Sequence, residues 1–221
     1  MRAALDLELL SWFALLGGPG EPAASPADER EVERLVGAAR GGDRAAGTAL
    51  YRLHVRHVFR AVRSLVRDEG EAEDVVQEAF VRALTRLDRY RPREGARFVS
   101  WVAAIALNVA RKRARWWRRA VPEDRAPKDD RAATGPEADA GEQLDLARRK
   151  AALLEALGEL EPREREIVSL RYGAELSAAE VGAALVLGEA NVRKICERQR
   201  KKLLERLREK LGDEGAEEEH R

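Results

Sequence analysis

Residues 176–211 read LSAAEVGAALVLGEANVRKICERQRKKLLERLREKL, and this stretch decides the fold. Ser177 and Glu180 match a capping box, in which the serine hydroxyl and the glutamate carboxylate each satisfy a free amide at a helix start. A short helix is therefore expected from about Ala178 to Leu185. After a glycine-containing turn, a long basic helix is expected from about Ala190 to Leu211. A short helix, a tight turn and a basic helix together predict a helix-turn-helix.

The second helix of this motif carries basic side chains beside its apolar ones. Asn191, Arg193 and Lys194 lie near the helix start, within reach of base edges in a DNA major groove. Arg198 and Lys201 follow further along and suit phosphate contacts. The charges alone fit a solvated helix equally well. The capping box and turn directly before them favour DNA.

The composition predicts an all-α protein of two small helical domains. Charged residues make up 37% of the 221 residues and aromatic residues 5%, a balance typical of helical bundles with solvated faces. The single cysteine, Cys196, excludes an intrachain disulfide and a cysteine-based metal cluster. The sequence contains no nucleophile elbow, phosphate loop or metalloprotease motif, so we expect neither an enzyme nor a cofactor.

Two further features have ordinary explanations. His54 and His57 lie three residues apart on an expected helix, a spacing that would let them share a metal ion. No third ligand is evident, so no metal site is expected. Arginines flank both histidines, which are therefore predicted to face solvent. The apolar opening from Leu5 to Leu16 is too short to span a bilayer. It is predicted to be a short amphipathic helix or a disordered extension of a cytoplasmic protein, without membrane insertion.

Segments rich in Gly, Pro and Ala divide the chain. Residues 1–28 form an N-terminal extension, and residues 29–119 form a first helical block, called the first block below. Residues 120–141 hold three prolines among charges of both signs and almost no large apolar residue, which predicts a flexible linker. Residues 142–211 form the second block, which contains the helix-turn-helix. An acidic tail, 212–221, ends the chain.

The first block carries an acidic face and a basic arm. Asp74, Gln77 and Glu78 lie at positions i, i+3 and i+4 of an expected helix, so they share one face and can form a polar docking surface for a partner helix. Residues 111–119 contain six basic residues and no acidic one, with Trp116 and Trp117 among them. Basic residues interleaved with aromatic ones suit single-stranded DNA, whose bases stack on rings.

These stretches resemble a known family. Residues 71–84 (EAEDVVQEAFVRAL) with residues 98–115 (FVSWVAAIALNVARKRAR) resemble region 2 of sigma-70-type factors. Residues 157–185 (LGELEPREREIVSLRYGAELSAAEVGAAL), with the helix after them, resemble region 4. No third region is recognisable between the two, which marks the extracytoplasmic-function (ECF) group.

The resemblance implies partners and roles. A sigma factor binds RNA polymerase core, through the β′ clamp helices and the β flap, and promoter DNA; an anti-sigma factor is a possible further partner. The residues implied to bind core are Asp74, Gln77 and Glu78. Those implied to bind the −10 element, beside the loop 91–96, are Asn108, Arg111, Arg113, Arg115 and Trp116. Those implied to bind the −35 element are Asn191, Arg193, Lys194, Arg198 and Lys201. Capture of extruded bases would offset their unstacking cost and favour promoter opening.

Three positions depart from the family pattern, and two other functions stay open. Ile195 stands where a basic residue is frequent, and Glu197 would repel phosphates if it faced them. Val186 stands in the turn where the family usually has glycine, and a β-branched residue tolerates positive φ poorly, so a rebuilt turn and a re-aimed recognition helix are expected. A dimeric helix-turn-helix regulator that acts without polymerase would explain the second block alone. An anti-sigma or adaptor protein would act through protein contacts only.

Overall fold

The structure is a computed structural model that describes residues 2–16, 29–66, 68–91, 97–120 and 140–211. Every regular element in these ranges is helical, which confirms the all-α prediction. In chain order the elements are α1 (Arg2–Ala14), α2 (Glu29–Arg40), α3 (Arg44–Arg63), α4 (Glu69–Thr85), η2 (Leu87–Arg89), α5 (Phe98–Ala120), α6 (Ala140–Gly158), α7 (Pro162–Val168), the π-helical turn η4 (Ser169–Gly173), α8 (Ala178–Leu185) and α9 (Glu189–Leu211). The predicted linker falls mostly, and the acidic tail wholly, outside the described residues.

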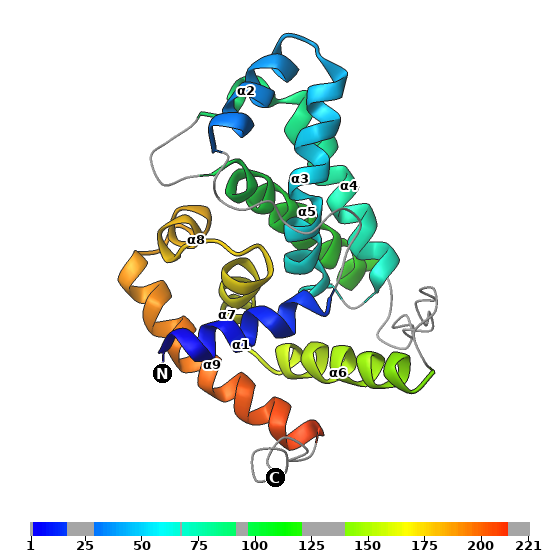
Figure 1. Ribbon diagram of the computed structural model, residues 1–221, viewed down its shortest axis with the longest axis vertical. Coiled ribbons are helices and arrows are strands. Elements are labelled where there is room, and N and C mark those ends of the chain that lie inside the picture. Colours follow the sequence, from blue (N-terminus) through cyan, green and yellow to red (C-terminus); the bar gives the residue numbers. More distant parts are fainter. Residues whose placement is uncertain (1, 17–28, 67, 92–96, 121–139, 212–221) are drawn as a thin grey trace.

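The first block folds into the bundle of α2 to α5 (Figure 1). Aspartates cap two of its helices. The Asp43 carboxylate accepts hydrogen bonds from the amides of Ala45 and Ala46 at the start of α3, and the Asp68 carboxylate accepts one of 2.7 Å from the Glu71 amide at the start of α4. Such caps satisfy amides that a helix start leaves without an intrahelical partner. The bundle packs its apolar residues between α3, α4 and α5.

The helix-turn-helix of the second block forms as predicted, because its signals are local. The capping box of Ser177 and Glu180 is present at the start of α8, and Pro162 occupies the first turn of α7. The expectation of a rebuilt turn is wrong. Val186 adopts the left-handed conformation itself, with φ 57° and ψ 52°, and its side chain is 91% exposed. Gly182 makes the turn possible, since a Cβ there would lie 2.7 Å from the carbonyl oxygen of Leu187.

Helix α1 packs on the second block, far from its place in the sequence (Figure 1). Leu9, Phe13 and Leu16 are 0%, 0% and 5% exposed. They share an apolar cluster with α6, α7, η4 and α9, and the Phe13 ring lies 6.1 Å from that of Tyr172. Of the two alternatives predicted for this segment, a helix and a disordered extension, the structure shows the helix. Within the described residues, no helix combines the length and the apolar character that crossing a membrane requires.

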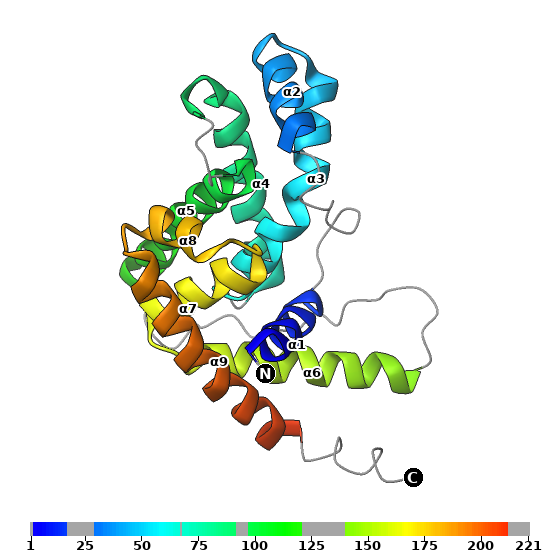
Figure 2. The ribbon, with the colours of Figure 1, turned by 60° about the vertical axis from the view of Figure 1, so that its left-hand side comes forward.

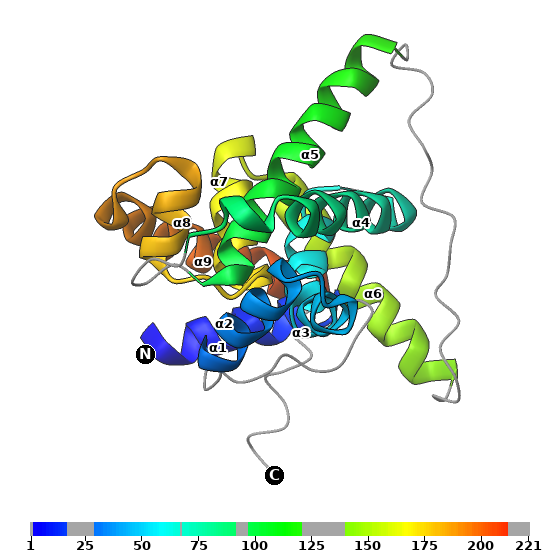
Figure 3. The same ribbon diagram turned by 90° about the horizontal axis from the view of Figure 1, so that it is seen from above.

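The two blocks pack against each other and share one apolar core. In Figure 2, α8 lies beside α5. The turn η4 also packs on α3. The cluster that contains the first block's core also includes Ile167, Leu170 and Leu176 of the second. The backbones approach most closely at Gly173, where a Cβ would lie 2.7 Å from the Cα of Ala61. The blocks are therefore closed on each other, as the view from above also shows (Figure 3).

The two histidines lie in this closed region, so the prediction that they face solvent is wrong. His57 is 8% exposed, and the His54 ring lies 5.3 Å from that of Phe98. Burial lowers the pKa of each imidazole to about 4. For His57, the Glu175 carboxylate opposes this shift without reversing it. Both rings are therefore neutral at pH 7.

Candidate nucleic-acid interface

The acidic face of α4 and the basic part of α5 meet in the structure. Asp74 and Gln77 are exposed, and the Glu78 side chain is 31% exposed. Arg113 donates from Nη2 to Glu78 Oε2 at 2.9 Å and from Nη1 to Asp74 Oδ2 at 3.4 Å. The hydrogen bond from Arg113 lowers the pKa of Glu78. Asp74 and Glu78, which are implied to bind polymerase, thus contact Arg113, which is implied to bind DNA.

An apolar groove adjoins this acidic face. It encloses about 580 Å³ between α2, α3 and α4, and its lining includes Gln77, Tyr51, Phe80 and Val81. Val81 is 63% exposed although it is a large apolar residue in the middle of a helix. Exposed apolar surface beside polar groups is typical of protein interaction sites.

On α5, the residues implied to bind the −10 element differ in their surroundings. Asn108 is exposed. Arg111 is paired with the second block: its Nε donates to Glu166 Oε1 at 2.6 Å and its Nη2 to Glu166 Oε2 at 2.5 Å. This hydrogen bonding raises the pKa of Arg111. The side chains of Arg115 and Trp116, and the loop residues 92–96, lie outside the described part of the chain.

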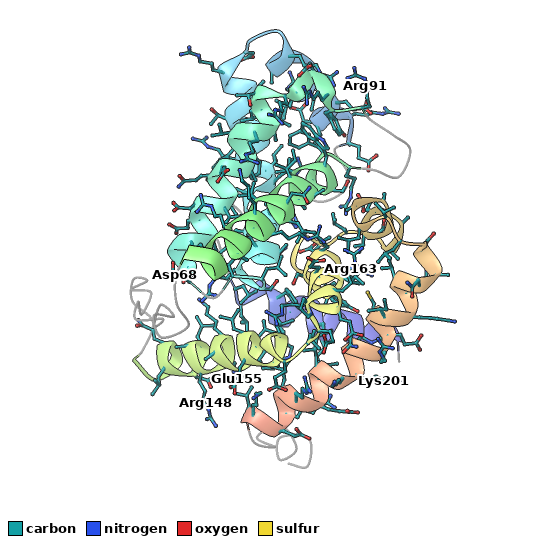
Figure 4. The ribbon with its side chains drawn as sticks, turned by 180° about the vertical axis from the view of Figure 1, so that it is seen from behind. Asp68, Arg91, Arg148, Glu155, Arg163 and Lys201 are labelled. Atoms are coloured by element: carbon teal, nitrogen blue, oxygen red, sulfur yellow. The ribbon has the colours of Figure 1, made fainter. Side chains whose placement is uncertain are left out.

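All five residues of α9 that are implied to bind the −35 element are exposed: Asn191, Arg193, Lys194, Arg198 and Lys201. Figure 4 shows Lys201 on the outer side of the helix. Arg193 is paired with Glu189 one turn earlier, and Arg198 with Glu164 of α7. The apolar residues Val192, Leu203 and Leu207 are buried on the opposite face. The helix therefore offers a row of polar and basic groups on its outer side.

Arg97, at the start of α5, is a contact residue that the sequence did not reveal. Its backbone N, Nε and Nη2 donate to the Glu180 carboxylate at 3.1, 2.9 and 3.0 Å, and Nη2 also donates to the Glu175 carbonyl at 2.7 Å. Burial pushes the pKa of Glu180 upward, but the hydrogen bonds from Arg97 and the Ser177 amide outweigh it and lower the pKa. Glu180 thus joins the blocks as well as capping α8.

A second charged contact that the sequence did not reveal lies on α3. Arg60 is 5% exposed and pairs with Glu175 of the second block, and its Nη2 lies 3.1 Å from Nδ1 of His57. Nearby, the Ser64 hydroxyl donates to the Ser169 hydroxyl at 2.6 Å. One signal in the sequence was available: Arg60 interrupts the apolar run Val58 to Val62, where a buried charge requires a partner.

Comparisons with known proteins match both blocks. The family model of sigma-70 region 2 matches residues 50–120, and that of sigma-70 region 4 matches residues 156–208. The RNA polymerase sigma factor CarQ of Myxococcus xanthus is 32% identical over 174 residues, which are 79% of this chain and 94% of CarQ. The ECF RNA polymerase sigma factor BldN of Streptomyces coelicolor is 28% identical over 172 residues, 77% of this chain but only 63% of BldN.

Solved structures give the same result for the fold. The structure of CnrH in complex with the cytosolic domain of CnrY matches with a TM-score of 0.56 and 27% identity, over 78% of this chain and 94% of the matched one. The sigma factor RpoE of Bartonella quintana, solved with the anti-sigma factor NepR, matches with a TM-score of 0.50 and 18% identity over 83% of this chain and 98% of the matched one, a likeness in fold alone.

Proposed function

Because this chain belongs to the ECF group of the sigma-70 family of RNA polymerase sigma factors, we propose that it binds polymerase core, directs it to a promoter and assists promoter opening. The observation that carries the proposal is that both DNA-binding regions of the family are present in order, and that α9 exposes polar and basic residues along its outer side. The polymerase performs the chemistry, and the chain acts by binding. A cytoplasmic location follows from this role.

Core binding is proposed for the acidic face of α4. Asp74, Gln77 and Glu78 supply polar contacts for a partner helix, and the exposed Val81 beside Gln77 supplies apolar area. A polar rim around apolar area is the usual composition of a protein interface. The β′ clamp helices are the proposed partner here, and the β flap is the proposed partner of the second block.

DNA binding is proposed for two separate surfaces. Asn108 would contact a flipped base of the −10 element, and the arginines of α5 would contact the backbone around it, with Trp116 as a stacking surface. The exposed residues of α9, beginning with Asn191, would read the −35 element as duplex in the major groove. Phosphate contacts from Arg198 and Lys201 would fix the register of the helix.

An anti-sigma factor is a further proposed partner. The solved structure of RpoE with NepR is a complex of a sigma factor with an anti-sigma factor, and this chain has the same fold. Co-purification of this chain from cells would identify that partner.

The decisive experiment mixes the purified chain with core polymerase. Co-elution with core, followed by run-off transcription from a specific start site, would establish the proposal. Specific DNA binding as a dimer without core would favour a helix-turn-helix regulator. Binding to a protein partner with neither core nor DNA would favour an adaptor.

The core-binding face has its own test. Replacing Asp74 and Gln77 by alanine should weaken core binding. Both side chains are exposed, so the fold should be unchanged by circular dichroism. The matched control is Asp88→Ala, because Asp88 is an exposed acid of the same block that lies in η2, beyond the end of α4. Equal core binding by both variants would place the docking surface elsewhere.

The −10 surface can be tested separately. Asn108→Ala should reduce permanganate reactivity of melted thymines more than it reduces closed-complex formation, because a base pocket acts only on extruded bases. The matched control is Gln143→Ala, which removes an exposed side-chain amide on α6, outside both proposed DNA surfaces. An equal loss in melting and in closed-complex formation would contradict a role in base capture.

A further inference from the structure

Helix α1 covers an apolar face of the second block. It packs on α6, η4 and α9, as Figure 2 shows for the two long helices. Leu9, Phe13 and Leu16 are the buried residues of this segment, and they are spaced i, i+4 and i+7. An amphipathic helix that binds an apolar surface presents its side chains at this spacing. The residues of the second block in the same buried cluster, called the α1-binding face below, include Leu153, Leu157, Tyr172, Leu204 and Leu207.

Helix α1 lies outside the parts of the chain that match the family. The two family models match residues 50–120 and 156–208, whereas α1 ends at Ala14. The region 4 model therefore describes the second block without this helix. The docking of α1 also contains little that only α1 could supply. Glu8 pairs with Arg208 at 3.5 Å, but an ion pair between two solvent-accessible side chains contributes little. Apolar packing is non-directional, so another helix of similar shape can replace α1.

With α1 in place, the second block offers a protein partner little apolar surface. Among its described residues, the exposed large apolar side chains are Leu144, Leu146 and Val186. The first two lie near the start of α6 and the third in the turn between α8 and α9, at separate places in Figure 1. The outer side of α9 is polar and basic, and α8 and η4 pack on the first block. Since a protein interface has an apolar centre, a partner of the second block needs the α1-binding face.

We propose that α1 covers the face by which the second block binds polymerase core, and that an apolar helix of core displaces α1 from it. The inference rests on the proposed function, in which core contacts the second block. It adds the face that makes the contact and α1 as an internal competitor. The partner helix carries bulky apolar side chains at positions i, i+4 and i+7, as α1 does. Such competition reduces the apparent affinity for core in proportion to the fraction of chains whose face is uncovered.

The first test compares two double variants of the full chain for binding to core polymerase, followed by biolayer interferometry. Leu9→Ala with Phe13→Ala, called the uncovered variant, weakens the docking of α1 while alanine keeps its helix propensity. The matched control, Ser11→Ala with Ala14→Ser, changes two exposed positions of the same helix. The uncovered variant should bind core at least about tenfold tighter than the parent, since one buried Leu or Phe contributes about that factor or more. The control should bind core as the parent does.

A synthetic peptide of residues 1–16 tests whether α1 and core use the same face. A fluorescein-labelled form should bind the uncovered variant in an anisotropy measurement without core. The unlabelled peptide in excess should weaken the binding of core to this variant. The same peptide with Leu9 and Phe13 replaced by alanine should do neither, because it lacks two of the side chains that the face buries.

Hydrogen exchange gives a measurement on the parent chain itself. The amides of residues 2–16 should exchange faster when core polymerase is added, because displaced α1 loses the packing that protects it. A detached helix of 13 residues is marginal in water, so its amides would open readily. Unchanged or slower exchange in this segment on core would overturn the proposal.

The remaining outcomes also decide the proposal. Core binding by the uncovered variant that is equal to or weaker than that of the parent would overturn it. Elution of the variant as a dimer without core would assign the face to a second copy of the chain, which contradicts it too. If the variant fails to fold by circular dichroism, the exchange measurement on the parent decides alone. Absence of core binding by every protein, the parent included, would overturn the proposed function, whereas peptide binding would still show that the face takes an apolar helix.

Discussion

Replacing Gly173 by alanine tests how tightly the two blocks are closed on each other. A Cβ at this position would lie 2.7 Å from the Cα of Ala61, 2.8 Å from its nitrogen and 3.1 Å from the carbonyl carbon of Arg60. Carbon atoms in contact prefer about 3.5–4.0 Å, so the surfaces must separate by about 1 Å here. The opposing atoms are backbone of α3, and no side-chain rotation can relieve the overlap.

Overpacking of this kind costs about 1–3 kcal/mol, and the cost applies to the closed form. Gly173→Ala should therefore shift the balance of closed and open forms about 5- to 150-fold toward the open form. Small-angle scattering would record a larger radius of gyration, and amides of α3 facing η4 would exchange hydrogen faster. The matched control is Gly158→Ala, because a Cβ there has nothing within 4 Å. A scattering curve and exchange pattern equal to those of the parent would refute the closed arrangement.

Three further predictions concern strain, pH and the N-terminal helix. Val186→Gly should raise the free energy of unfolding, measured by urea denaturation, by about 1 kcal/mol, because valine is strained in a left-handed conformation. Val81→Gly, at an exposed position in the middle of α4, should lower the same free energy by about as much. The pKa values of His54 and His57 fall to about 4 on folding, so the unfolded chain binds more protons than the folded one between about pH 6.5 and 4. The free energy of unfolding should therefore decrease as the pH falls through that range. If replacing both histidines by glutamine left this pH dependence unchanged, the loss would belong to other groups. Phe13→Ala should speed hydrogen exchange in α1, because we expect this helix to detach before the rest of the second block unfolds. A loss of global stability as large as the roughly 3–5 kcal/mol of an ordinary core phenylalanine would contradict that expectation.

The helix-turn-helix could be predicted from the sequence almost residue by residue. Its signals act over three or four positions: the hydroxyl of Ser177 and the carboxylate of Glu180 cap one helix start, and Pro162 fits another. The turn at Val186 was the exception. Local preference argued against positive φ there, but the close packing of Leu187 on Gly182 holds the turn in place.

The closed arrangement could not be predicted, because its contacts join residues far apart in the chain. Arg111 and Glu166 are 55 positions apart, and Arg60 and Glu175 are 115. Each side chain alone resembles an ordinary surface charge, and only the fold brings them together. The histidines were misjudged for the same reason: their arginine neighbours in sequence suggest solvent, while Glu175 and Phe98 reach them from other elements.

The docking of α1 has a consequence for how the protein is made. Its apolar residues are synthesised roughly 190 residues before Leu207, which belongs to the buried cluster around them. At 5–20 residues per second this delay is about 10–40 s. Throughout that time Leu9, Phe13 and Leu16 lack the part of their cluster that α9 supplies, so this part of their apolar face is exposed to chaperones and to other nascent chains. A chain that stops before α9 would leave that part of the face uncovered, while α6 and η4 cover the rest.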